Sequence, residues 1–232
     1  MSTFAQVDTG AMVAVPVLGT RAEKTRGTIL DAAEAVFAEK GFAATRLEDV
    51  AAIVGIRRAS IVYYFRDKRD LYEAVLERLF SNLHARFREV MSPHLALATQ
   101  VETAVSAWVD YIGEHPTLAR LLLREIADAS GAVPEPAVVR HVRPLLGAIE
   151  HVVRAGQRQG IFEPVDPVHL ASTIAGATVF FVAATPLLGK DWPFDPLSKD
   201  QLATHRSEVL RITRRLLGAA RLRQAKRPST GR

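Results

Sequence analysis

The sequence predicts an all-α protein of about nine helices. Apolar residues recur at intervals of three and four along most of the chain, which is the spacing of one helix face. Ala, Leu, Val and Arg dominate the composition, and this mixture favours helices. No segment has convincing strand alternation. The 232 residues are enough for a sizeable core in one or two domains.

The predicted helices near the start of the chain are closely spaced. The first spans about residues 22–40, and Gly41 is its expected stop. The stretch TRLE at 45–48 predicts a capping box, in which threonine and glutamate side chains each pair with a backbone amide. The second helix, which starts there, ends at Gly55, and a third covers about residues 58–64. Two short helices joined by a tight turn form a helix-turn-helix pattern.

The fourth predicted helix is long and joins the two halves of the chain. Asp67 caps it and Asp70 lies in its first turn. Apolar residues then keep helical spacing until Ser92-Pro93 ends the helix. We expect the domain boundary to lie inside this helix, without a flexible linker.

The next three helices are bounded by turn-forming residues. His115-Pro116 separates the fifth helix from the sixth. The sequence SGAVPEP at 130–136 is expected to be a loop, and Gly160 ends the seventh helix. Pro144 lies inside the seventh helix and is expected to kink or split it.

The last two helices are predicted from their caps. Asp166-Pro167 starts an eighth helix that runs to about residue 185. Ser198, with Gln201 three positions later, predicts a second capping box for a ninth helix that ends at about residue 223. The eighth is long enough for a membrane span, but its polar residues argue against insertion. These are His169, Ser172, Thr173, Thr178 and Thr185, with Pro186 just beyond.

The overall charge does not by itself indicate a nucleic-acid partner. The formal net charge is +5, but eight basic residues and no acid lie between positions 211 and 232. Removing those eight charges from +5 leaves −3 for the rest of the chain. We interpret the basic end as a solvated helix end and tail. Any case for DNA binding therefore needs a local patch.

Several kinds of chemistry are excluded or disfavoured. The chain has no cysteine, so it has no disulfide, thiolate nucleophile or cysteine-ligated metal, and it is compatible with a cytoplasmic location. Serine-hydrolase, zinc-protease and P-loop motifs are missing from the sequence. His141 and His151 lie ten residues apart, not at the i, i+4 spacing of a metal pair. We predict no catalytic residue, no metal and no cofactor.

A local basic and aromatic patch lies at the third predicted helix. With the turn and the start of the fourth helix, it holds five basic residues against one acid. Arg57 and Arg58 stand at the leading end of the helix, where a groove-bound helix meets base edges. Arginine pairs bidentately with guanine. The hydroxyls of Ser60, Tyr63 and Tyr64 suit phosphate oxygens, which hold a protein in register.

Four motifs follow one another from about residue 25 to 76: FAEKGF, the threonine cap, VAxxxGI, and YYFxxK followed by LY. This segment resembles the N-terminal domain of the TetR family of transcriptional regulators. The resemblance implies that Gly55 forms the turn and Phe65 packs in a small core. It implies DNA contacts in three groups: Thr45 and Arg46 with phosphates; Arg57, Arg58 and Ser60 facing the groove; Tyr63, Tyr64 and Lys68 with the backbone.

Two positions depart from the family pattern. Arg57 stands where the family usually has a serine or threonine that caps the recognition helix. Because arginine cannot accept from the helix amides, we expect a less fixed helix start and a DNA contact by Arg57 instead. Val62 stands where tyrosine is common, which removes one aromatic contact.

The resemblance also implies a second domain that dimerises and binds a small molecule. Small residues in the eighth helix and apolar residues in the ninth predict a four-helix dimer interface at about 167–187 and 199–220. A ligand pocket is expected among the fifth to eighth helices, for an apolar or amphipathic effector. Its candidate lining residues are Trp108, Tyr111, Leu122, Glu125, Ile126, Ile149, Thr173, Thr178 and Phe181.

Together these features predict a homodimeric repressor that binds a near-palindromic double-stranded DNA operator and is released by the effector. The predicted parts are a disordered arm, a DNA-binding domain, a ligand-binding and dimerisation domain, and a disordered tail, at 1–20, 21–68, 69–223 and 224–232. Two alternatives stay open: a helical dimeric interaction protein without specific DNA binding, and an enzyme built on a helical bundle.

Overall fold

The computed structural model describes residues 20–128, 138–184 and 194–218, and all regular structure in these ranges is helical. The helices are α1 (Thr20–Ala44), α2 (Leu47–Val54), α3 (Arg58–Tyr64), α4 (Lys68–Val90), α5 (Leu97–Glu114), α6 (Pro116–Asp128), α7 (Val139–Arg158), α8 (Pro167–Ala183) and α9 (Lys199–Leu216). The all-α prediction is thus confirmed over the described ranges. The predicted loop at 130–136, the N-terminal arm and the basic tail lie outside them.

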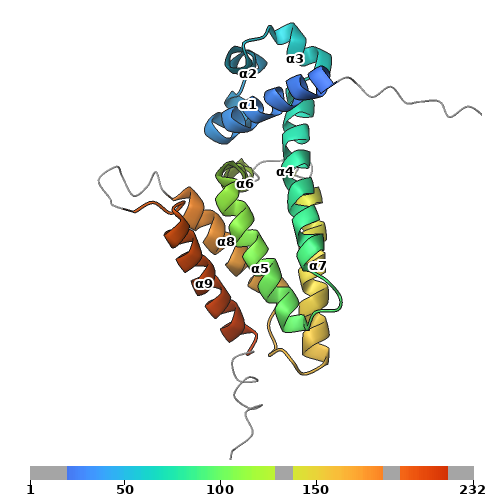
Figure 1. Ribbon diagram of the computed structural model, residues 1–232, viewed down its shortest axis with the longest axis vertical. Coiled ribbons are helices and arrows are strands. Elements are labelled where there is room, and N and C mark those ends of the chain that lie inside the picture. The colour runs from blue at the N-terminus through green and yellow to red at the C-terminus, as the bar shows by residue number, and fades with distance from the viewer. Residues whose placement is uncertain (1–19, 129–137, 185–193, 219–232) are drawn as a thin grey trace, which may run out of the picture.

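One long helix connects two groups of helices (Figure 1). The first three helices form a small cluster at one end of the molecule, which we call the head. α4 leaves the head and continues into a bundle with α5, α7, α8 and α9. α6 lies at the junction, where it packs against α1 of the head and α8 of the bundle.

The head forms because each of its helices buries one apolar face. Phe37 from α1, Val50 from α2 and Ile61 from α3 are completely buried in a shared core. Burying a side chain of this size stabilises a fold by about 1.5–3 kcal/mol. Gly41 and Gly55, with φ of 79° and 74°, supply the left-handed turns that end α1's main run and α2. Phe65 is buried in the same core, as expected.

Both predicted capping boxes are wrong, while both predicted aspartate caps are confirmed. Asp67 accepts a hydrogen bond from the Asp70 amide at 2.9 Å, and Asp166 accepts from two amides at the start of α8. By contrast, the Thr45 hydroxyl donates backward to the Gly41 carbonyl at 2.7 Å. Likewise, the Ser198 hydroxyl donates to a preceding carbonyl and makes no cap bond. A hydroxyl can donate as well as accept, whereas a carboxylate only accepts.

The start of α2 is instead built one residue later. Arg46 is the N-cap, and its amide donates to the Asp49 carboxylate at 2.9 Å. The Nζ atom of Lys40 lies 3.0 Å from Oδ1 of the same carboxylate. The backbone hydrogen bond from Arg46 and the bond from Lys40 hold the pKa of Asp49 below its ordinary value. Glu48 takes no part in this cap.

Within the bundle, α5 packs against α4, α7, α8 and α9. α7 passes through Pro144 as one helix, so the predicted split does not occur. A Cβ atom on Gly156 would lie 2.0 Å from the Phe162 ring, which leaves no room for a side chain there. α9 ends at Leu216, earlier than predicted, and Gly218 follows with φ of 69°. No helix in the described ranges is long and apolar enough to cross a membrane.

Candidate nucleic-acid interface and ligand cavity

The exposed face of α3 carries two arginines and a tyrosine. Arg57 is the N-cap and makes no side-chain cap bond, as expected from its inability to accept. Arg57 and Arg58 are exposed, and Tyr63 is 79% exposed. The opposite face of the helix buries Ile61 completely, so the polar side chains are held outward by the packing of the head.

Arg58 has a partner that the sequence does not predict. Its Nε lies 3.0 Å from a carboxylate oxygen of Glu48 on α2. Both side chains are well exposed, so the pair contributes little to stability. It does hold the guanidinium near α2. The contact depends on how α2 and α3 cross, so the spacing of the two residues in the sequence does not predict it.

Ser60 and Tyr64 are more enclosed than their neighbours. Both are half-buried, and Tyr64 packs against the head's core. The rings of Tyr63 and Tyr64 meet edge to face, with centroids 5.1 Å apart. Tyr64 therefore has a structural role, whereas the exposed side chain of Tyr63 is free to reach a phosphate.

The structure gives internal partners to two of the predicted phosphate contacts. Thr45 is 1% exposed, so a phosphate contact there would have to come from its backbone. Lys68 donates from Nζ to the carbonyls of Phe42 and Ala43, at 2.8 and 3.1 Å, and lies over the Phe42 ring. Its ammonium thus caps the end of α1. Arg46 is exposed.

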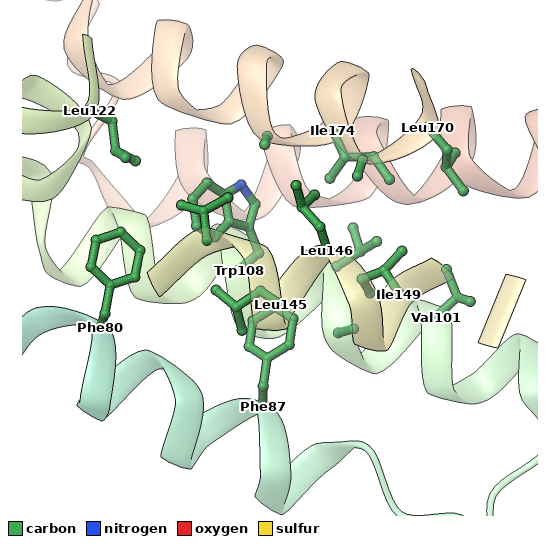
Figure 2. A pocket seen from close by; sticks show the side chains of 15 residues that line it. Phe80, Phe87, Val101, Trp108, Leu122, Leu145, Leu146, Ile149, Leu170 and Ile174 are labelled. Carbon is green, nitrogen blue, oxygen red and sulfur yellow. The ribbon is translucent and has the colours of Figure 1, made fainter. Parts of the chain in front are cut away.

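A cavity of about 100 Å³ lies inside the bundle, between helices that are far apart in the sequence (Figure 2). Its walls come from α4 to α8 and are formed by the side chains of Phe80, Phe87, Val101, Ala104, Val105, Trp108, Leu122, Val142, Leu145, Leu146, Ile149, Leu170, Ala171, Ile174 and Ala175. An apolar cavity of about 150 Å³ in another protein binds benzene, so this one is in the range of small apolar ligands.

Three of the predicted pocket residues, Trp108, Leu122 and Ile149, lie on the cavity wall. Tyr111 does not line it: its hydroxyl donates to the Leu79 carbonyl at 2.5 Å, deep in the core. Burial raises the pKa of Tyr111 to about 12. Glu125 accepts a hydrogen bond from the Tyr72 hydroxyl at 2.6 Å, at the boundary with α4.

The other predicted pocket residues are spread over different surfaces. Thr178 is fully buried, and its hydroxyl lies 3.3 Å from His205 Nε2. Phe181 stacks on the same histidine, with ring centroids 4.1 Å apart. Thr173 is exposed on the outer face of α8. Ile126 is 70% exposed and borders a second, outer hollow of about 420 Å³ between α6, α7 and α8.

The sequence did not identify most of the cavity wall, including Phe80 and Phe87 on α4 and Leu145 and Leu146 on α7. Their apolar spacing indicated helix faces, but not which face meets an unfilled space. Within the described residues, no group of three His, Asp or Glu side chains is arranged to hold a metal ion.

A helix-turn-helix head joined to a helical bundle with an apolar cavity defines the class of this protein: it is a ligand-responsive, DNA-binding transcriptional regulator. Two family descriptions match the chain. Residues 29–75 match "Bacterial regulatory proteins, tetR family", and residues 98–212 match "Tetracyclin repressor-like, C-terminal domain". The chain belongs to the TetR family, which is a family of regulatory proteins.

Individual relatives agree with this assignment. The HTH-type transcriptional regulator RutR of Escherichia coli (strain K12) is 28% identical over 161 residues, which cover 68% of this chain and 74% of RutR. The HTH-type transcriptional repressor NicS of Pseudomonas putida is 28% identical over 171 residues, which cover 71% of this chain and 79% of NicS. The crystal structure of FadR from Bacillus subtilis in complex with stearoyl-CoA has a TM-score of 0.64 at 17% identity, covering 83% of this chain and 98% of FadR. This last likeness concerns the fold alone.

Proposed function

We propose that this protein is a repressor that binds a near-palindromic operator as a homodimer and leaves it when an apolar or amphipathic effector enters the bundle. α3 enters the major groove, where Arg57, Arg58 and Ser60 face base edges. Tyr63 and Arg46 contact phosphates, whereas Thr45, Tyr64 and Lys68 make contacts inside the head that keep these helices in position. The observation that carries the proposal is the outward-facing set Arg57, Arg58 and Tyr63 on a helix anchored by buried Ile61.

The proposed dimer forms through α8 and α9. Along the outer face of α8, Val168 is 54% exposed and Phe180 is 62% exposed, with the small residue Gly176 between them. On α9, Ile212 and Leu216 are 40% and 41% exposed. An exposed apolar strip on two adjacent helices, with a small residue for close approach, suits a four-helix interface with a second copy.

Release is proposed to pass through α6, which touches both functional regions. Leu122 of α6 lines the cavity. Two residues further on, Arg124 donates from Nε to the Ala38 carbonyl of α1 at 3.1 Å and from Nη2 to the carbonyl of Glu39. A ligand that prefers one position of α6 therefore also favours one position of α1. Its effect on DNA binding is limited by its difference in affinity for the two states.

An apolar or amphipathic effector is supported by the cavity wall. Stearoyl-CoA, which the FadR structure contains, is one amphipathic molecule bound by a protein with this fold. The repressor role is supported by NicS, which is named a transcriptional repressor. The NicS likeness covers most of both chains.

The test is fluorescence anisotropy with a labelled duplex from upstream of the protein's own gene, at several salt concentrations. We expect specific binding that weakens as salt rises, because bound phosphates release counterions. Arg58→Ala should lose sequence preference, by about 5–150-fold on the preferred duplex. Tyr63→Phe, which removes only an exposed hydroxyl, should weaken binding to every duplex by about fivefold.

Tyr64→Phe serves as the matched control, because Tyr64 is half-buried beside the same ring. A random-duplex selection covers the case in which the operator lies elsewhere. If selection yields no preferred sequence, and binding is weak and unchanged by Arg58→Ala, the helix is not a DNA reader. The alternative of a dimeric interaction protein would then be favoured.

A further inference from the structure

The cavity wall contains one polar atom without a partner. The indole Nε1 of Trp108 is buried, and it has no hydrogen-bond partner within the part of the chain that the structure describes. Figure 2 shows the indole among the lining side chains, with its nitrogen on the ring edge turned toward α8. Indole nitrogen only donates, and a buried tryptophan N–H usually finds an acceptor.

The side chains that line the cavity within the described residues offer this N–H no acceptor. Each of the other fourteen lining side chains is aliphatic or a phenylalanine. Among residues 20–128, 138–184 and 194–218, the cavity is lined by fifteen side chains, and none of these is charged. An unpaired buried donor costs about 1–3 kcal/mol, so the position calls for an explanation.

A bound water does not supply that explanation well. A buried water is held by two to four polar partners, and cavities lined by apolar groups stay dry. Here the side chains of the described walls would give a water one hydrogen-bond partner, the Trp108 N–H. An acceptor carried by an otherwise apolar ligand satisfies the N–H and fills the space in one step.

We propose that the cavity binds an uncharged, compact, apolar molecule with one hydrogen-bond acceptor, such as a ketone, ester, lactone or ether, whose acceptor pairs with Trp108 Nε1. This inference rests on the proposed effector role of the cavity and narrows its ligand class. A charged group inside is disfavoured, because none of the described lining residues is charged and could compensate its desolvation. A larger ligand can extend toward the outer hollow, which shares Trp108, Leu122, Val142, Leu146 and Ala175 with the cavity.

The test uses two probes of matched shape. Cyclopentanone and methylenecyclopentane share a skeleton and differ only in carrying a carbonyl oxygen or a methylene carbon. Their affinities are measured by calorimetry on the full-length wild type and on Trp108→Phe, which keeps an aromatic ring and removes the N–H. For each protein we take the ratio of the two probe affinities and compare this ratio between wild type and Trp108→Phe. The comparison cancels the probes' unequal hydration and the change in cavity size. We expect Trp108→Phe to weaken cyclopentanone about tenfold more than it weakens methylenecyclopentane.

A second readout follows the N–H itself. The chain has two tryptophans, so the indole region of a proton–nitrogen NMR spectrum holds two signals, and Trp108→Phe assigns them. Cyclopentanone should move the Trp108 signal downfield, whereas methylenecyclopentane should not. Cyclobutanecarboxylate tests the charge claim and is expected to bind at least tenfold more weakly than cyclopentanone.

The outcomes separate this inference from the proposed function. If both neutral probes bind but their affinity ratio is the same in wild type and variant, the Trp108 anchor is wrong and the cavity remains the effector site. If no probe binds, the inference and the effector role fail together, while operator binding by the free protein stands on its own anisotropy measurement. Tighter binding of the carboxylate would overturn the uncharged ligand class.

Discussion

The DNA-facing helix and the cavity are built in opposite ways. The polar side chains of α3 come from one seven-residue helix, so neighbours in the sequence are neighbours in space. The cavity takes its walls from residues between positions 80 and 175. The side chains proposed to touch DNA mostly face solvent, whereas the cavity wall is also the core of the bundle. We therefore expect function and stability to be separable in the head and to be coupled in the bundle.

The largest expected effect is on bundle stability. Gly156→Ala places a Cβ atom 2.0 Å from the Phe162 ring, so the packing between α7 and Phe162 must shift. Such overpacking costs about 1–3 kcal/mol. The melting temperature should fall by roughly 2–12 °C in calorimetry. Operator affinity, measured well below the transition, should stay unchanged because the head is not altered.

Gly147→Ala on the same helix is the matched control, because a Cβ there has nothing within 4 Å. It should leave the melting temperature unchanged or raise it slightly, since alanine favours a helix more than glycine does. Equal effects of the two substitutions would show that Phe162 does not restrict this position.

A second stability effect should depend on pH. Tyr111→Phe removes the hydrogen bond to Leu79 and should lower the free energy of unfolding by about 1 kcal/mol near neutral pH. The folded-state pKa of Tyr111 is about 12, above the ordinary value of 10.0. Its contribution is therefore fully present below pH 10 and is lost as the pH rises toward 12.

Urea unfolding between pH 8 and pH 11.5 should show the wild type losing stability more steeply than Tyr111→Phe. Because Tyr111 does not line the cavity, Tyr111→Phe should leave the affinity for cyclopentanone unaltered. Parallel pH curves for the two proteins would contradict the assigned pKa shift.

A third prediction concerns α6, the part of the regulatory domain that holds the head. Arg124→Gln removes the guanidinium that bonds to the Ala38 and Glu39 carbonyls. Amides near the end of α1 should then exchange with deuterium about tenfold faster, while those of α9 stay unchanged. Arg120→Gln, an exposed position on the same helix, should leave exchange in α1 unaffected. If Arg120→Gln speeds exchange equally, the contact is not specific to Arg124.

The smallest expected effect is in the head. Glu48→Gln removes the carboxylate that pairs with Arg58 and would repel phosphates. Operator affinity at low salt should rise about two- to fivefold, and the gain should shrink as salt screens the charges. Glu89→Gln, an exposed position near the far end of α4, makes the same change in net charge. Anisotropy should show no gain for Glu89→Gln, and weaker binding by Glu48→Gln would mean that Glu48 positions Arg58 for DNA.

The contrast between the two regions also explains which sequence predictions succeeded. Helix ends at Gly41, Gly55 and Ser92-Pro93 were predictable because backbone conformation there depends on the residue itself. Asp67 was predictable as a cap because a carboxylate can only accept. Thr45 was not, since its hydroxyl had an earlier carbonyl within reach.

The cavity shows where sequence reasoning stops. Trp108 and Thr173 both lie on expected helices, yet one lines the cavity and the other faces outward. Which face of α8 turns inward is decided by its packing against α5, α6 and α7, and a single amphipathic pattern does not contain that information. The same holds for Arg58 and Glu48, whose contact follows from the crossing of two helices.

The unbroken course of α4 has a mechanical consequence. The helix has 23 residues and carries Phe80 and Phe87 of the cavity wall on the same rod whose first turn adjoins α3. At 1.5 Å per residue, the rod is about 34 Å long, so a tilt of about 5° about its far end moves the near end by about 3 Å. Successive base pairs of DNA are about 3.4 Å apart along the helix axis. A tilt that shifts Phe80 by only about 1.3 Å can thus carry a reading helix by nearly one step of the duplex.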